Sequence, residues 1–192
     1  MRVVISLLIV LLGSASSQGA ESKLRTVRNN YFEVVGLDLR SVTYVNELSA
    51  FAVQIAQRYL EREGMAFPQP ILISLRPEAH VDFEGDYRIR VRERNSVQLD
   101  LRWEESMTLP LATRTIAEAL LLQYSIFNFG TEASKSIRAW PIEALSAEVY
   151  YGLRPGIFLE FLNRRRAQPE LSLTELAETL RATVSPASDD GY

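Results

Sequence analysis

The sequence predicts a single α+β domain. Three observations lead to this prediction: strand-like segments and one helix occupy the first half, four helical segments follow one another in the second half, and no repeat or low-complexity linker divides the chain. The 192 residues include no cysteine, and 47% of them are hydrophobic. A chain of this size can bury about two thirds of its surface, so packing alone can hold the fold.

The N-terminus has the pattern of a secretory signal peptide. Arg2 precedes an unbroken apolar run at 3–12, and small and polar residues follow it. About ten apolar residues are too few for a membrane span, which needs roughly 20. We therefore expect a signal peptide over 1–20, cleaved between 15 and 21, and a domain over 21–183. That domain would be periplasmic or secreted, with no stable membrane span after cleavage.

Two strands and a helix are expected next. Residues 31–35 form a β-rich run, and after a polar turn at 38–43 apolar residues three or four apart predict a helix that ends at Gly64. Two prolines then stop the helix. The continuous apolar run at 71–75 follows them and predicts a central strand of a sheet.

Residues 87–102 alternate between apolar and polar side chains, which predicts a β-hairpin. A three-residue loop at 94–96 would keep the apolar residues together on one face. It would also place Arg90 opposite Asp100, whereas a two-residue loop would put arginines beside leucines. The alternation therefore predicts both the hairpin and its register.

Four helices are expected in the second half. The first begins at Thr108, has Pro110 in its first turn and ends by Gly130. The last begins with a capping box. The later helices are expected at about 141–152, 155–166 and 172–180, followed by a flexible polar tail at 184–192.

Composition excludes several kinds of chemistry. The formal charge of -3 gives no summed positive field for nucleic acid, and no glycine-rich phosphate loop is present for a nucleotide. His80 is the only histidine and cysteine is absent, so no zinc site can be built on thiolates or on two imidazoles. We expect no cofactor.

Two segments of the second half carry a family resemblance. Residues 139–152 read Ala-Trp-Pro-Ile-Glu-Ala-Leu-Ser-Ala-Glu-Val-Tyr-Tyr-Gly, and residues 115–123 read Thr-Ile-Ala-Glu-Ala-Leu-Leu-Leu-Gln. Together they resemble the active site of the gluzincins, the peptidase MA-like zinc peptidases. That family has roughly Trp-x-x-Glu-Gly-x-Ala-x-Tyr after a His-Glu-x-x-His helix. The resemblance covers about 31–180 and implies a zincin-like domain: a small mixed sheet with one helix and a hairpin at the cleft edge, then a bundle of about four helices.

The resemblance places Glu118 at the general base and Glu143 at the third zinc ligand. Ala117 and Leu121, however, stand where the family has its two histidines, and those histidines hold zinc from one helix face. We therefore expect a catalytically inactive, metal-free domain. Its remaining role would be structural or the binding of a protein or peptide, with Trp140 as a binding residue.

Other interpretations of the same residues stay open. Glu118 and Glu143 could act together as a metal-independent hydrolase, since two carboxylic acids suffice for glycoside hydrolysis. Glu118 could also pair with Arg114, one turn before it on the same helix. A third interpretation makes the arginine row at 88–94 the surface of an unrelated envelope interaction module that binds an acidic partner. Its binding residues would be Arg88, Arg90 and Arg92.

The acidic segment 78–86 has one further interpretation. If the segment is extended, alternate residues would share one side and could hold a cation, although such alternation is usually a solvated face. The residues concerned are His80, Asp82, Glu84 and Asp86.

Overall fold

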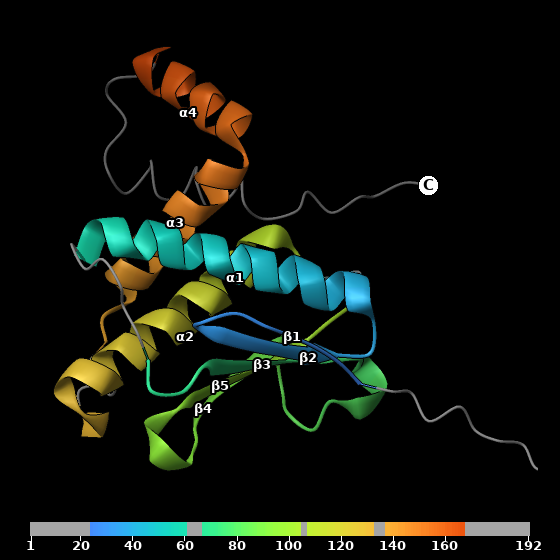
Figure 1. Cartoon of the computed structure of the whole chain (residues 1–192). Coiled ribbons are helices and arrows are strands. Elements are labelled where there is room, and N and C mark those ends of the chain that lie inside the picture. The colour runs from blue at the N-terminus through green and yellow to red at the C-terminus, as the bar shows by residue number, and fades with distance from the viewer. Residues whose placement is uncertain (1–23, 61–66, 105–106, 133–136, 168–192) are drawn as a thin grey trace, which may run out of the picture.

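The computed structural model describes residues 24–60, 67–104, 107–132 and 137–167. This part of the chain is a mixed α+β domain with one five-stranded sheet (Figure 1). The predicted signal peptide at 1–20, the expected end of the first helix at Gly64, the helix expected at 172–180 and the tail at 184–192 lie outside the described residues.

The sheet has the strand order β1-β2-β3-β5-β4. Strands β2, β3 and β5 run parallel, and the outer strands β1 and β4 are antiparallel to their neighbours. The central position of β3 confirms the prediction, whereas β1 was missed because it contains a single apolar residue, Val27. The strands are β1 (Arg25–Arg28), β2 (Phe32–Gly36), β3 (Ile71–Arg76), β4 (Tyr87–Val91) and β5 (Val97–Arg102).

Helix α1 (Leu39–Leu60) connects the parallel strands β2 and β3. The expectation that 38–43 form a turn is wrong, because Asp38 caps the helix. Its carboxylate accepts backbone N–H hydrogen bonds from Ser41 at 2.8 Å and Arg40 at 3.3 Å. These hydrogen bonds, that of Ser41 first, lower the pKa of Asp38. The helix therefore begins directly after its cap.

Strands β4 and β5 form the expected hairpin, but the predicted register is wrong by two residues. Arg88, and not Arg90, lies opposite Asp100. The loop has five residues, 92–96, and a backbone hydrogen bond of 2.7 Å joins its first and last residues. A shift of two residues keeps every side chain on the same face, so the alternation could not distinguish the two registers. The loop residues with positive φ are Arg94 and Asn95.

Helices α2 (Leu109–Phe129), α3 (Ala139–Leu153) and α4 (Pro155–Ala167) follow the sheet. The predicted ends of α2 are confirmed: the Thr108 side chain accepts the Leu111 N–H, and Gly130 ends the helix. Helix α3 packs on α2, and α4 contacts α3 and projects away from the sheet (Figure 1). Within the described ranges, no helix has the length and apolarity needed to cross a membrane.

Gly152 does not end α3, contrary to the prediction, since that helix continues to Leu153. A Cβ atom at Gly152 would lie 2.9 Å from the ring of Phe51 on α1, which is closer than side chains normally approach. The absence of a side chain at Gly152 therefore allows α1 and α3 to pack closely at this point.

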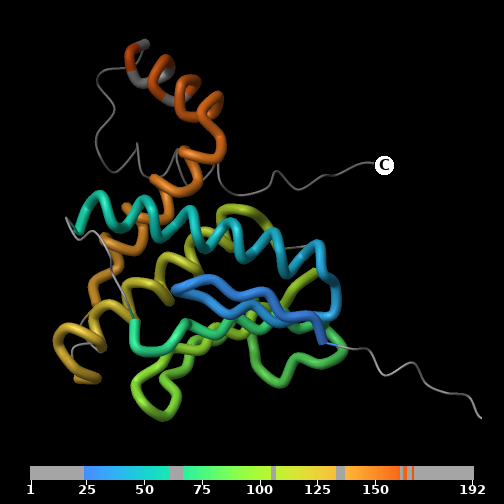
Figure 2. The backbone as a smooth tube through the Cα atoms, viewed as in Figure 1, coloured from blue at the N-terminus to red at the C-terminus, as the bar shows by residue number. Residues whose placement is uncertain are grey.

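The two faces of the sheet differ in character. One face carries fully buried apolar side chains such as Val34, Ile73 and Leu99, and α1 and α2 cover it (Figures 1 and 2). The opposite face carries Ser74, Asp100 and several arginines, and no described helix covers it. Strand β4 forms the edge farthest from β1 (Figure 2). This face, which carries most of the charged residues of the sheet, therefore has no described helix over it and lies beside the edge strand β4.

Candidate functional site

Side chains from β4, α2 and α3 form one polar network. The Tyr87 phenol donates a hydrogen bond of 2.8 Å to Glu118 Oε2, and Arg114 Nη1 donates to the phenol oxygen at 3.4 Å. Arg114 Nε donates to Glu143 Oε1 at 3.0 Å. Glu118 and Glu143, the two carboxylates singled out from the sequence, are thus joined through two side chains.

The helix and sheet geometry explains this convergence. Arg114 and Glu118 are four residues apart on α2, so they project from the same helix face. Tyr87 begins the edge strand, and alternation places its side chain on the helix-covered side of the sheet. Glu143 lies in the first half of α3, which packs along α2.

Electrostatics favour the protonated forms of both central groups. The hydrogen bond to Glu143 raises the pKa of Arg114, and the nearby charge of Glu118 raises it further. Burial, and then the hydrogen bond to Glu118, raise the pKa of Tyr87. At neutral pH the network therefore presents a neutral phenol and a guanidinium cation to its two acidic residues.

The partners within the network differ from the expected pairing. Arg114 forms its ion pair with Glu143 rather than with Glu118, whose hydrogen-bond donor is Tyr87. Tyr87 was not identified as a site residue, because nothing local marks it among the alternating residues of its strand. Only the packing of α2 against the edge strand brings it to Glu118.

The two positions where the resemblance expects histidines cannot hold zinc. Ala117 is fully buried, Leu121 is partly buried, and neither offers a ligand atom. Within the described ranges, no three His, Cys, Asp or Glu residues are grouped as a metal site. Hydrogen bonding and charge are what this network offers a ligand.

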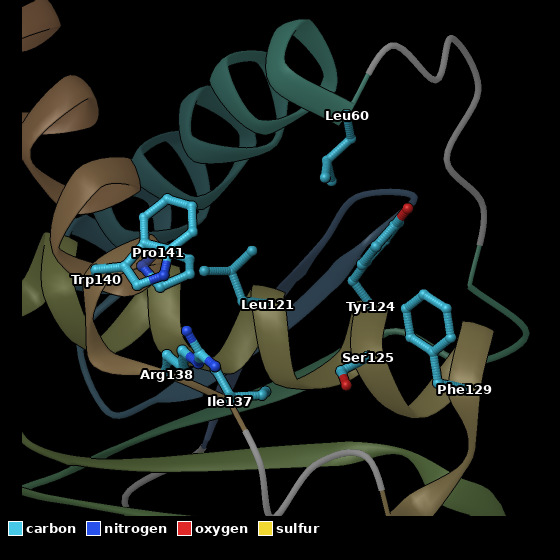
Figure 3. A pocket seen from close by; sticks show the side chains of 9 residues that line it. All are labelled: Leu60, Leu121, Tyr124, Ser125, Phe129, Ile137, Arg138, Trp140 and Pro141. Carbon is cyan, nitrogen blue, oxygen red and sulfur yellow. The ribbon is translucent and has the colours of Figure 1, made fainter.

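A mostly apolar pocket lies one turn along α2 from Glu118 (Figure 3). Its volume is about 590 Å³, and Trp140, the expected binding residue, forms part of its wall with 67% of its surface exposed. Leu121, at a position where the resemblance expects a zinc-binding histidine, contributes an apolar side chain to the wall of this pocket. The lining residues are Leu60, Leu121, Tyr124, Ser125, Phe129, Ile137, Arg138, Trp140 and Pro141.

The predicted arginine row does not continue as one line. Arg88 and Arg90 point to the uncovered face of the sheet, where they donate to Asp100 Oδ2 at 3.2 and 2.7 Å. Arg92 and Arg94 lie in the exposed hairpin loop. The contact between Arg90 and Asp100 is the one expected, although it is diagonal rather than directly across the strands.

The acidic segment 78–86 is not extended, so the condition for the cation interpretation is not met. Its start, Glu78–His80, is a turn of 3-10 helix, and Gly85 has a φ of +81°. Asp82 forms an ion pair of 3.0 Å with Arg88. The acidic residues of this segment therefore do not line one side.

The outer edge of β4 has no strand partner among the described residues. The Arg102 N–H donates to the Asp86 carbonyl at 2.9 Å, which marks a hydrogen-bonded pair at the start of the hairpin. Because such pairs alternate along an antiparallel ladder, the intervening residues direct their backbone N–H and C=O groups outward. These residues are Tyr87, Ile89 and Val91.

Comparison with known proteins finds no match: no protein-family model, no curated protein and no solved structure matches the chain. The relationship to the gluzincins thus stands as a resemblance carried by the quoted residues.

Proposed function

We propose that the chain is an exported, catalytically inactive, zincin-like domain that binds a segment of a protein or peptide in extended form along β4. The observation that carries this proposal is the outer edge of β4, which pairs with no strand in the described part of the chain. Tyr87 holds this edge beside the network of Arg114, Glu118 and Glu143. An exposed strand edge is a template for an added strand, because its outward N–H and C=O groups need partners.

The order of elements supports the zincin-like part of the proposal. A strand, a helix and a central strand precede a hairpin with an antiparallel edge strand, and two helices then carry Glu118 and Glu143. This is the order that the gluzincin resemblance implies. Ala117 and Leu121, in place of the histidines, support the loss of catalysis, and the signal-like N-terminus supports export.

The surroundings of β4 support peptide binding. Side chains of an added strand would alternate between the two faces of the sheet. Those on the helix-covered side would approach Arg114 and Glu118, which offer both a cationic donor and an acceptor. The pocket that Trp140 lines could take a nearby apolar side chain.

A metal-independent hydrolase using Glu118 and Glu143 stays an alternative. Such chemistry requires one carboxyl group to donate a proton. In the described network Glu143 accepts a hydrogen bond from Arg114 and Glu118 accepts one from Tyr87, so neither carboxyl group is placed as a donor. We therefore rank this alternative second.

The test of edge binding is a proline substitution. Val91→Pro removes an outward N–H while leaving the ladder to β5 intact, and Val91→Thr is the matched control because it keeps that N–H. Binding of a fluorescent octapeptide of alternating Thr and Gln, followed by anisotropy, is expected to weaken about tenfold, roughly 1.4 kcal/mol, in V91P alone. Equal binding by both variants would exclude the edge as the binding site.

The test of inactivity uses the same peptide with zinc added. Mass spectrometry is expected to find the peptide intact, and EDTA is expected to leave its binding unchanged. Zinc-dependent cleavage that disappears in Glu118→Gln would show a working peptidase. Zinc-independent cleavage that requires Glu118 and Glu143 would support the hydrolase alternative.

A further inference from the structure

The uncovered face of the sheet carries an arginine cluster made of Arg76, Arg88, Arg90 and Arg102 around Asp100. The Asp100 side chain is fully buried beneath these guanidinium groups. Its Oδ2 accepts hydrogen bonds from Arg88 and Arg90, and Arg76 Nε lies 3.5 Å from its Oδ1. The carboxylate thus anchors the cluster from below.

The cluster has more positive than negative charge. Arg76 lies directly opposite Arg102 on the neighbouring strand, a pairing of like charges that destabilises a sheet. Against the four guanidinium groups stand the buried Asp100 and Asp82, which pairs with Arg88 at the surface. An anion bound at this face would relieve the repulsion.

The outer N–H groups of the cluster are accessible to a ligand, since the side chains of Arg76, Arg88 and Arg90 are 34%, 27% and 44% exposed. The Nε atoms of Arg76, Arg88 and Arg102 are buried and make no hydrogen bond among the described residues, although Arg76 Nε faces Asp100. These buried Nε atoms add positive charge below the surface and are not themselves contact groups. Guanidinium groups bind carboxylates with strong, charge-assisted hydrogen bonds.

We propose that the arginine cluster selects an acidic peptide, in which Asp or Glu occupies alternate positions of the strand added to β4. This inference rests on the proposed function. Arg88 and Arg90 belong to β4 itself and are two residues apart, so alternate residues of an added strand would lie beside them on the uncovered face. The acidic residues of the ligand are therefore spaced i, i+2.

The shape of the charge distribution favours a peptide over an extended polyanion. The arginines gather at β3, β5 and β4. Farther across the same face, Arg28 on β1 lies opposite Glu33 on β2, two opposite charges with no net charge between them, and Ser74 on β3 is uncharged. A nucleic acid or a membrane surface would need positive charge spread along its length. The compact cluster at the strand edge matches a few carboxylates instead.

The experiment compares fluorescent octapeptides of alternating Thr and Glu or Thr and Gln, which differ only in charge. At low salt the chain is expected to bind the Glu peptide about tenfold more tightly, a preference that falls at high salt. Arg102→Gln and Arg90→Gln should each reduce this preference and leave the affinity for the Gln peptide unchanged. Arg40→Gln, at the exposed start of α1 and away from β4, is the matched control and should change neither.

R102Q and one further variant, Arg90→Lys, keep the test independent of folding. Arg102 makes no contact with Asp100 within hydrogen-bond distance, so R102Q does not disturb the buried carboxylate. Arg90→Lys keeps the charge and should restore most of the preference that R90Q loses. Circular dichroism and thermal unfolding verify that each variant is folded.

Each of the other possible results would contradict one specific part of the proposal. Equal affinity for the two peptides, with binding still lost in V91P, would overturn the acidic preference and keep the edge site. Binding of the Glu peptide that V91P does not weaken would place the acidic ligand away from the edge and overturn the inference. Absence of binding by either peptide would contradict the proposed function itself.

Discussion

The Tyr87 phenol donates a hydrogen bond of 2.8 Å to Glu118, and this contact joins the edge strand β4 to α2. The two residues are 31 positions apart in the sequence and come from different layers of the fold. The contact fixes β4 relative to the helix beside it, at the place where we propose that a peptide strand is added.

The titration of Tyr87 tests the network. The difference in tyrosinate absorbance between the wild-type protein and Tyr87→Phe reports the ionisation of Tyr87. This difference is expected to titrate at higher pH than N-acetyltyrosinamide, because burial and the hydrogen bond to Glu118 raise the pKa of Tyr87. Since the folded state binds this proton more tightly, its contribution to stability is present below the ordinary pKa of about 10. It is lost as the pH rises through the folded-state value.

Arg114 supplies the internal control for that titration. Its positive charge lowers the pKa of Tyr87, in opposition to the larger effects of burial and Glu118. Arg114→Gln is therefore expected to move the Tyr87 titration to still higher pH. A midpoint at or below that of the free tyrosine derivative, or a downward shift in R114Q, would contradict the described network.

Gln123 is expected to stabilise the hairpin loop. Its side chain is almost fully buried, accepts the Val97 N–H at 2.8 Å and donates to the Asn95 carbonyl at 3.0 Å. Gln123→Leu leaves both backbone groups without these partners and should lower the free energy of unfolding by about 2 kcal/mol in urea titrations. The control Gln54→Leu, on the exposed side of α1, should change it by less than about 0.5 kcal/mol.

Asp100 is expected to be essential for the stability of the uncovered face. Asp100→Asn keeps the shape of the side chain but leaves the arginine cluster without its central negative charge. Asp100 is buried and accepts hydrogen bonds from Arg88, Arg90 and Gln98, whereas the arginines left behind are partly exposed to water, so the loss should be about 2 kcal/mol. Asp82→Asn removes an exposed partner of Arg88 and should cost less than about 1 kcal/mol. Equal losses in urea denaturation would argue against the central role of Asp100.

Gly152 tests the contact between α1 and α3. Gly152→Ala adds a Cβ against the Phe51 ring and should destabilise the domain by about 1 kcal/mol, although alanine favours helix. Gly156→Ala in α4 is the matched control, because nothing lies within 4 Å of its added Cβ, and it should be neutral or stabilising. Replacing Phe51 by leucine should remove most of the cost of G152A. Equal melting temperatures of the two alanine variants would show that the close approach of α1 and α3 does not require glycine at position 152.

Local sequence patterns were sufficient for most elements of the described fold. The apolar run of β3 identified a central strand, and Thr108, Pro110 and Gly130 marked the ends of α2 correctly. These signals succeed because capping, proline geometry and side-chain alternation act over a few neighbouring residues. Strand β1 lacked such a signal, since its pairing with β2 is what orders it.

The gluzincin resemblance, and not a local structural pattern, singled out Glu118 and Glu143. It did not predict the arrangement around them. Tyr87 and the pairing of Arg114 with Glu143 depend on how β4, α2 and α3 pack together. The hairpin register likewise depended on loop geometry, because a period of two residues is unchanged by a shift of two.

Sequence alone thus determined the α+β class, the central strand and the absence of metal-binding side chains at positions 117 and 121, because each is a property of residue type or of short-range spacing. Tertiary structure decided which charged groups meet. The hydrogen bond from Tyr87 to Glu118 and the burial of Asp100 beneath the arginines join residues that are distant in sequence. Such contacts form only when strands and helices pack, since hydrogen bonds and ion pairs act over a few ångströms.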